Sequence, residues 1–232
     1  MMTEKPILFN TEMVRAILDG RKTQTRRLVK PQPVYDDGLW ELGGAGWSDS
    51  HVTIHPVPGH SLWERQPVQP GDVLWVRETW QYIPESDVDG FYVYAADRED
   101  PAEWKWRPSI HMPRKAARLF LQVMGVRIER LRDITAKDAF NEGTGKLFLE
   151  DIAYGDKDYE CDLDDEYGMA REQFAWLWES TLKKDNLERY GWWANPWVWV
   201  IEFERFDGKP AGLWADRNTA QYADQDVLMP AT

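Results

Sequence analysis

The residues with the most obvious chemistry are four cations in one short stretch, GRKTQTRR at positions 20–27 of a 232-residue chain with a formal net charge of −12. A cluster of guanidinium and ammonium groups can bind a phosphate or a nucleotide. Arg21 and Lys22 also have a structural explanation, because they follow a predicted helix whose C-terminal dipole favours cations by a few tenths to about 1 kcal/mol. That explanation does not reach Arg26 and Arg27, which fall on the β-like TQTRRLV. A solvated cationic surface is the plain alternative to a site.

Short strands and helices are expected to position this cluster. A helix begins at Asn10 or Thr11, which can cap it, and ends at Gly20. Alternation of apolar and polar residues predicts strands, and apolar residues at helical spacing predict further helices. The predicted strands lie in KPILF, GDVLWVRETW, FYVYAA, LFLQVMGVRIERL and NPWVWVIEF, and the later helices lie in DITAKDAFNEG and MAREQFAWLWESTL. Without regular alternation of strand and helix, this order favours an α+β fold, a mixed β-barrel or curved sheet with flanking helices.

One domain is expected over residues 1–206, because a chain of this length can bury one sizeable core. Stretches rich in proline, glycine or acidic residues predict loop insertions near 31–69, 81–105 and 145–166. Residues 207–232 are expected to form a C-terminal tail.

Composition excludes several classes of protein and site. The single Cys161 rules out an internal disulfide and a cysteine-rich zinc site, and a reducing cytoplasm fits best. His51 and His55 lie among prolines and β-branched residues that prevent a helical metal pair, so neither a metal nor another cofactor is expected. No apolar run is long enough to cross a membrane, and the N-terminus lacks a signal-peptide pattern. The acidic balance argues against broad, charge-driven binding to duplex nucleic acid.

Several blocks, taken in order, resemble the ASCH domain family of the PUA-like superfamily. They are GRKTQTRR after a short helix, GDVLWVRETW, RPSIHMPR, LFLQVMGVRIERL leading into DITAKDAFNEG, and the final NPWVWVIEF. More narrowly, the chain is similar to the longer ASCH-type proteins of bacteriophages and prophages. The resemblance covers most of residues 5–206 and implies a small PUA-like β-barrel with a cleft that admits a nucleotide or an RNA segment, in the cytoplasm of a bacterial host.

The resemblance also implies a chemistry. The smallest bacterial members include amidohydrolases that remove the acetyl group from N4-acetylcytidine with a lysine and a threonine of this motif and a glutamate on a later strand. Carried over by position, the lysine is Lys22 and the threonine is Thr25. A lysine with a lowered pKa can take the proton of a threonine hydroxyl, and nearby arginines lower a lysine's pKa. The glutamate falls at Gln122, which cannot accept a proton or balance a cation.

Other residues of these blocks are candidates for completing the site. Glu78 is the candidate carboxylate beside Lys22, with a strand-end salt bridge to Arg77 or Arg27 as its structural alternative. Trp75 and Trp80 are candidates for stacking on a base, although a tryptophan on a barrel strand is more often part of the core. The remaining candidates for substrate binding are Arg21, Arg26, Arg27, His111 and Gln122.

The sequence therefore leads to a nucleoside- or RNA-recognising ASCH-type protein, with hydrolysis of an amide on an acylated base as the candidate activity. Two alternatives remain open: a non-catalytic module that binds RNA or modified nucleotides, favoured by Gln122, and a metal-independent ribonuclease. The expected partners are a nucleoside, a nucleotide or single-stranded RNA, with a host protein as a further candidate and no membrane.

Overall fold

A computed structural model describes residues 2–49, 53–84, 90–99, 105–144 and 163–207. The helices are α1 (Thr11–Leu18), α2 (Ala136–Asn141), α4 (Leu163–Ser180) and α5 (Lys184–Tyr190). The strands are β1 (Glu4–Leu8), β2 (Gln24–Leu28), β3 (Val34–Asp36), β4 (Leu39–Leu42), β5 (Ala45–Ser48), β6 (Thr53–Ile54), β7 (Val73–Arg77), β8 (Trp80–Ile83), β9 (Phe91–Tyr94), β10 (Phe120–Arg130) and β11 (Trp197–Arg205). None of the helices in these ranges is long and apolar enough to cross a membrane.

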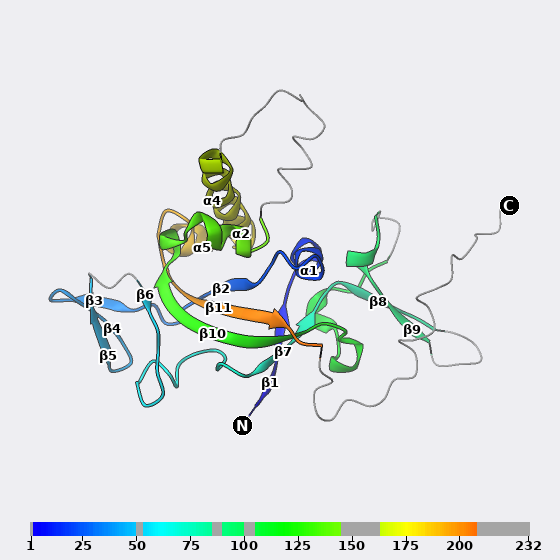
Figure 1. Cartoon of the computed structure of the whole chain (residues 1–232), viewed down its shortest axis with the longest axis horizontal. Helices are drawn as coiled ribbons and strands as arrows, with labels where there is room; N and C mark the ends of the chain where they lie inside the picture. Colours follow the sequence, from blue (N-terminus) through cyan, green and yellow to red (C-terminus); the bar gives the residue numbers. More distant parts are fainter. Residues whose placement is uncertain (1, 50–52, 85–89, 100–104, 145–162, 208–232) are drawn as a thin grey trace.

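The central sheet has the strand order β1-β7-β10-β11-β2, and β6 pairs with one end of β10. β1 and β7 run parallel, whereas the other neighbours are antiparallel. Strand β10 is long enough to pair with β7 at its start and with β6 near its end. A register shift between Val123 and Gly125 breaks its ladder with β11, and such a bulge bends a strand. Figure 1 shows β10 strongly curved around the middle of the molecule.

Curvature brings the two edges of this sheet close together. Arg27 on β2 donates from Nη2 to the carbonyl oxygen of Leu8 on β1, at 3.1 Å. No strand ladder joins β1 to β2 among the described residues, so the sheet is curved with a side-chain link across the gap. The α+β class expected from the sequence is confirmed, because several sheets are combined with helices.

Two apolar clusters cover opposite faces of β11. Trp197, Trp199, Ile201 and Phe203 belong to the main core with α1, whereas Val198 and Val200 pack with residues of α2 and α4. This two-sided burial explains why NPWVWVIEF is a continuous apolar run rather than an alternating one. Trp197 and Trp199 are buried and act as core residues.

The stretch 31–69 is more regular than the loop that its prolines suggest. It contains a small antiparallel sheet, β3-β4-β5, which is anchored by its indoles. The rings of Trp40 and Trp47 lie 5.5 and 5.3 Å from that of Trp197, both edge-on. The guanidinium of Arg130 lies over Trp40 at 5.0 Å. Aromatic and cation–π packing therefore fixes this segment to the start of β11.

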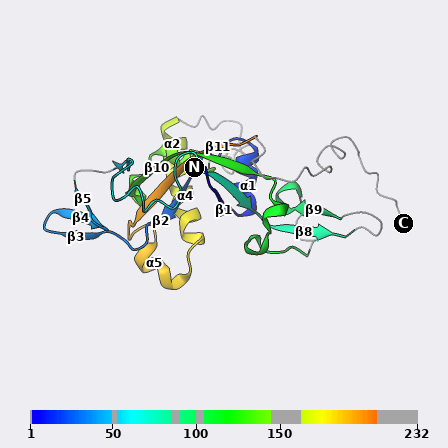
Figure 2. The same ribbon diagram turned by 90° about the horizontal axis from the view of Figure 1, so that it is seen from below.

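The segment predicted as a second insertion, 81–105, contains the β8–β9 hairpin, and its predicted strand FYVYAA is realised in β9. Figures 1 and 2 place this hairpin and the β3–β5 sheet at opposite ends of the molecule, with the central sheet between them. Most of the third insertion and all but the start of the tail lie outside the described residues. The helix predicted near residues 169–182 corresponds to α4.

Candidate functional site

Lys22 is held in place by the way helix α1 ends. The Asn10 side chain caps its first turn by accepting from Met13 N at 2.8 Å. Gly20 has φ +75°, which glycine adopts without the strain that a side chain would cause. The turn lets the backbone N–H groups of Arg21 and Lys22 donate to Ala16 O at 2.9 and 3.0 Å. The lysine therefore leaves the helix end pointing inward, just before β2 begins.

The ammonium of Lys22 forms a buried ion pair with Glu142, the residue that follows α2. Nζ donates to Glu142 Oε2 and to Glu142 O, both at 2.8 Å, and to Gln24 O at 2.9 Å. The side chains of Lys22 and Glu142 are 0% and 3% exposed. All three ammonium protons have acceptors, as a buried charge requires.

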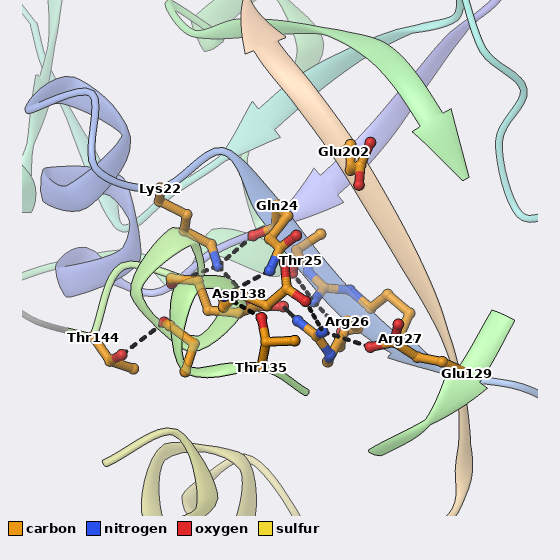
Figure 3. Close-up of polar contacts among 12 residues, drawn as sticks. Lys22, Gln24, Thr25, Arg26, Arg27, Glu129, Thr135, Asp138, Thr144 and Glu202 are labelled. Atoms are coloured by element: carbon orange, nitrogen blue, oxygen red, sulfur yellow. Dashed lines mark hydrogen bonds and ion pairs between the residues drawn. The ribbon is translucent and has the colours of Figure 1, made fainter. Parts of the chain in front are cut away.

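Arg26 extends this pair into a network. Its Nη1 donates to Glu142 Oε1 at 3.0 Å and its Nη2 to Glu129 Oε1 at 2.5 Å. On its other side the guanidinium lies 5.6 Å from the centre of the Phe174 ring on α4. Arg26 therefore joins β2, β10, α2 and α4, and it is buried among carboxylates rather than available to an external phosphate (Figure 3).

The network reaches solvent through Arg127 on β10. Its Nε donates to Glu129 Oε2 at 2.9 Å and its Nη2 to Asp138 Oδ2 at 3.3 Å. It also pairs with Glu202, whose side chain is 49% exposed, while that of Asp138 is 22% exposed. The network thus contains three cations, Lys22, Arg26 and Arg127, and four carboxylates, Glu142, Glu129, Asp138 and Glu202. At its outer end the side chains of Asp138 and Glu202 are more exposed than that of Arg127.

Thr25 lies beside this network on β2 and is buried. Its hydroxyl oxygen accepts from Arg27 Nη1 at 2.7 Å. The Phe9 ring lies under both neighbouring cations, 5.5 Å from Lys22 Nζ and 5.4 Å from Arg27 Cζ. Phe9 therefore packs against Lys22 and Arg27, and the guanidinium proton that Arg27 donates favours the alkoxide form of Thr25.

Burial lowers the pKa of Lys22, and the carboxylate of Glu142 opposes that shift. The charges of Arg27 and Arg26 lower the pKa further. A lysine with a lowered pKa supplies a neutral amine at less alkaline pH, which is what a general base requires. Lys22 and Thr25 are both buried.

Glu78 and Gln122, the two residues considered for the carboxylate position beside Lys22, have other neighbours in the structure. Glu78, expected beside Lys22, forms a two-point ion pair with Arg118 at 2.9 and 3.0 Å. Gln122 lies on β10 opposite Val73 and Glu204, half-buried. The carboxylate that contacts Lys22 is that of Glu142, at the end of α2.

The remaining predicted residues are dispersed. Trp80 is buried against Tyr92 and Met112, so it is a core residue. The guanidinium groups of Arg77 and Arg114 lie 5.5 and 5.8 Å from the centre of the Trp75 ring. His111 is exposed in the short 3-10 helix Ser109–His111. Arg21 stays near the site, because its Nη1 donates to Gly143 O at 3.0 Å.

Sequence reasoning missed Glu129, Asp138 and Glu142. Asp138 and Glu142 are four residues apart in DITAKDAFNEG, a spacing that puts both on one face of a helix. Arg127 and Glu129 alternate with apolar residues on β10, so they share the face opposite the core. These spacings are the features of the sequence from which the three acids could have been predicted. Among the described residues no group of three metal-ligating side chains is present.

Gly143 offers a test of how tightly Lys22 is held. It has φ +92°, and an added Cβ would lie 2.8 Å from Ala16 Cβ and 3.2 Å from Lys22 Cβ. We expect Gly143→Ala to cost about 1–2 kcal/mol in backbone strain and about 1–3 kcal/mol more in crowding. Gly20→Ala is the matched control, because its φ is also positive but nothing lies within 4 Å. Equal losses of unfolding free energy in denaturant titrations would contradict the close packing.

The ion pair between Glu78 and Arg118 provides a second test, which asks whether Glu78 stabilises the fold. We expect Glu78→Gln to lower the free energy of unfolding by about 1–3 kcal/mol, because it weakens charged hydrogen bonds in a buried place. Glu202→Gln, at a half-exposed position, serves as the control and should change stability by less. A stable Glu78→Gln variant would show that its pairing with Arg118 contributes little.

None of the compared protein-family models, curated proteins or solved structures matches the chain. The resemblance to ASCH proteins therefore rests on the sequence blocks and their order, and it stays a prediction. The described residues form an α+β protein in which Lys22 and Glu142 pair in a buried polar network, and Thr25 lies three residues after Lys22 with its hydroxyl bound to Arg27.

Proposed function

We propose that the chain is an ASCH-type protein of the PUA-like superfamily that recognises a nucleoside or an RNA base and hydrolyses an amide on it, with an acylated cytidine such as N4-acetylcytidine as the substrate class. The observation that carries this proposal is the buried contact between Lys22 Nζ and Glu142 Oε2, 2.8 Å long, with Nζ also bound to Gln24 O, the carbonyl that precedes Thr25. It pairs the lysine of the motif with a carboxylate, and Thr25 is the threonine of the same motif. The curved sheet and the order of its elements are compatible with the family fold.

In the proposed reaction, the neutral amine of Lys22 takes the proton of the Thr25 hydroxyl, and Oγ1 attacks the acyl carbon. The bond between the acyl carbon and the amino nitrogen breaks, and the nitrogen leaves with the proton from Lys22. Water then hydrolyses the ester on Thr25 and releases the acid. Glu142 orients Lys22, and Arg27 stabilises the negative charge that develops on Oγ1.

The decisive substitution is Thr25→Val, which removes the hydroxyl at nearly constant volume. We expect the release of cytidine from N4-acetylcytidine to fall by at least about 100-fold, since the nucleophile is lost. Thr23→Val is the matched control, because Thr23 is exposed in the same segment and should leave the rate unchanged. The measurement is chromatography of the reaction products. A Thr25→Val variant as fast as the wild type would remove Thr25 from the mechanism.

The pH dependence of the same reaction tests Lys22. Because burial lowers the pKa of Lys22 below 10.5, the neutral amine forms as the pH rises through that lowered value. We expect kcat/KM to rise with pH through a pKa below 10.5. Glu142→Gln should shift this rise to lower pH, because the carboxylate that favours the ammonium is removed. A rise that stays in place in Glu142→Gln would exclude the pair as the titrating group.

A second function is favoured by one specific observation. All three protons of Lys22 have acceptors in the structure, and this arrangement suits a stable ammonium ion. In that case the protein is a reader that binds a modified nucleoside or RNA without changing it. Binding of N4-acetylcytidine in calorimetry, together with no cytidine release over hours, would support the reader and contradict the hydrolase.

A further inference from the structure

A groove on the outer side of α4 lies outside the lysine network. It encloses about 600 Å³ and is formed by one face of α4, the Trp192–Trp193 turn after α5, and Arg132 from the short 3-10 helix Leu131–Asp133. On α4 the lining residues recur at positions 171, 172, 175, 176 and 179, which puts them on one side of a helix. The opposite side, with Ala170, Phe174 and Trp178, packs toward the core. The groove and the network thus lie against different faces of the same helix.

Two exposed indoles mark this groove. The exposed fractions of Trp176 and Trp193 are 74% and 78%, the highest among the large apolar residues that the structure describes as exposed. Their burial would be favourable, and exposed aromatic surface at a concave place is typical of a binding site. The guanidinium of Arg132 lies 5.2 Å from the centre of the Trp193 ring, so a planar cation already packs on that indole.

The walls of the groove are fixed to one another. Arg171 on α4 donates from Nη2 to Arg132 O at 3.0 Å. The backbone N–H of Trp192 donates to Glu179 Oε1 at 3.3 Å, and the Trp178 indole donates to Tyr190 O at 2.8 Å. The ring of Trp192 also packs edge-on against Phe174, at 6.3 Å. Because these bonds connect all three segments, little ordering is required when a ligand binds.

The lining residues favour a planar, aromatic ligand. Ala175 is the one aliphatic residue among them, so the groove lacks the larger aliphatic contacts that would receive the apolar face of a peptide helix. Its apolar surface consists mainly of indole rings beside a guanidinium, and nucleobases stack on both kinds of plane. Arg132 and Arg171 are balanced by Glu172 and Glu179, so attraction to phosphates is weak here.

We propose that this groove binds a single-stranded nucleic acid segment by stacking its bases on Trp176 and Trp193. Stacking provides the affinity, and the two arginines contact at most about two phosphates. The dependence on salt is therefore shallow: the slope of log K against log salt concentration should be no steeper than about −1.4, from about −0.7 per phosphate contact on a single strand. The site is separate from the lysine network and does not require that network to be catalytic.

The experiment titrates the full chain with a fluorescein-labelled, unmodified octanucleotide and follows anisotropy. Trp176→Ala and Trp193→Ala should each weaken binding by about tenfold, because each removes a stacking surface. Both side chains are largely exposed, so the melting temperatures should stay unchanged. Phe91→Ala is the matched control: this half-exposed aromatic lies on the β8–β9 hairpin, away from α4 (Figure 1), and its removal should leave the affinity unchanged.

A second ligand separates stacking from charge. An octamer with the same phosphate backbone but abasic sugars keeps the charges and loses the bases, and we expect it to bind at least about tenfold more weakly than the normal octamer. Equal binding of the two octamers, a salt slope much steeper than about −1.4, or wild-type affinity in both tryptophan variants would overturn the proposal. So would a wild-type dimer in sedimentation that both tryptophan variants convert to monomer, because the groove would then be an interface between copies of this chain.

Discussion

The ion pair between Lys22 and Glu142 is the interaction on which the arrangement of this protein depends. Each of these two charges is buried, and a buried charge without a partner costs several kcal/mol. The end of α1, the start of β2 and the end of α2 must therefore meet at one place. Arg26 adds Glu129 on β10 and the Phe174 ring on α4 to the same requirement. Electrostatics thus fixes the position of helices that the curved sheet alone would hold only by apolar packing.

The same constraint defines what the site can do. Carboxylates occupy both guanidinium ends of Arg26, so the cationic cluster of the sequence is mostly neutralised within the fold. The exposed part of this region is then formed by Asp138 and Glu202 rather than by a positive surface. Arg27 differs from Arg26, because it contacts the hydroxyl of Thr25 and a backbone carbonyl instead of a carboxylate. It is the arginine whose charge acts on the reacting group in the proposed mechanism.

Local patterns in the sequence predicted the elements better than their contacts. The helix at 11–18 has a cap, an apolar face and a terminal glycine, so its limits follow from neighbouring residues alone. The partner of Lys22 is 120 residues away, and no local rule selects Glu142 over Glu78 or another acid. Gln122 was considered because of its position in an aligned block on a strand, whereas the carboxylate that contacts Lys22 comes from the end of a helix. The β3–β5 sheet was missed because its prolines and glycines obscured short strands that depend on Trp197 and Arg130 for anchoring.

Burial lowers the pKa of Lys22 more than the carboxylate of Glu142 raises it. The most direct measurement is an NMR titration of the Lys22 side chain in the folded protein, with the resonance assigned by a Lys22→Arg variant. We expect a pKa below the ordinary 10.5, and a still lower value in Glu142→Gln. Titration of Lys22 at or above 10.5 in the wild-type protein would contradict this expectation, because the carboxylate of Glu142 would then outweigh burial in setting the pKa.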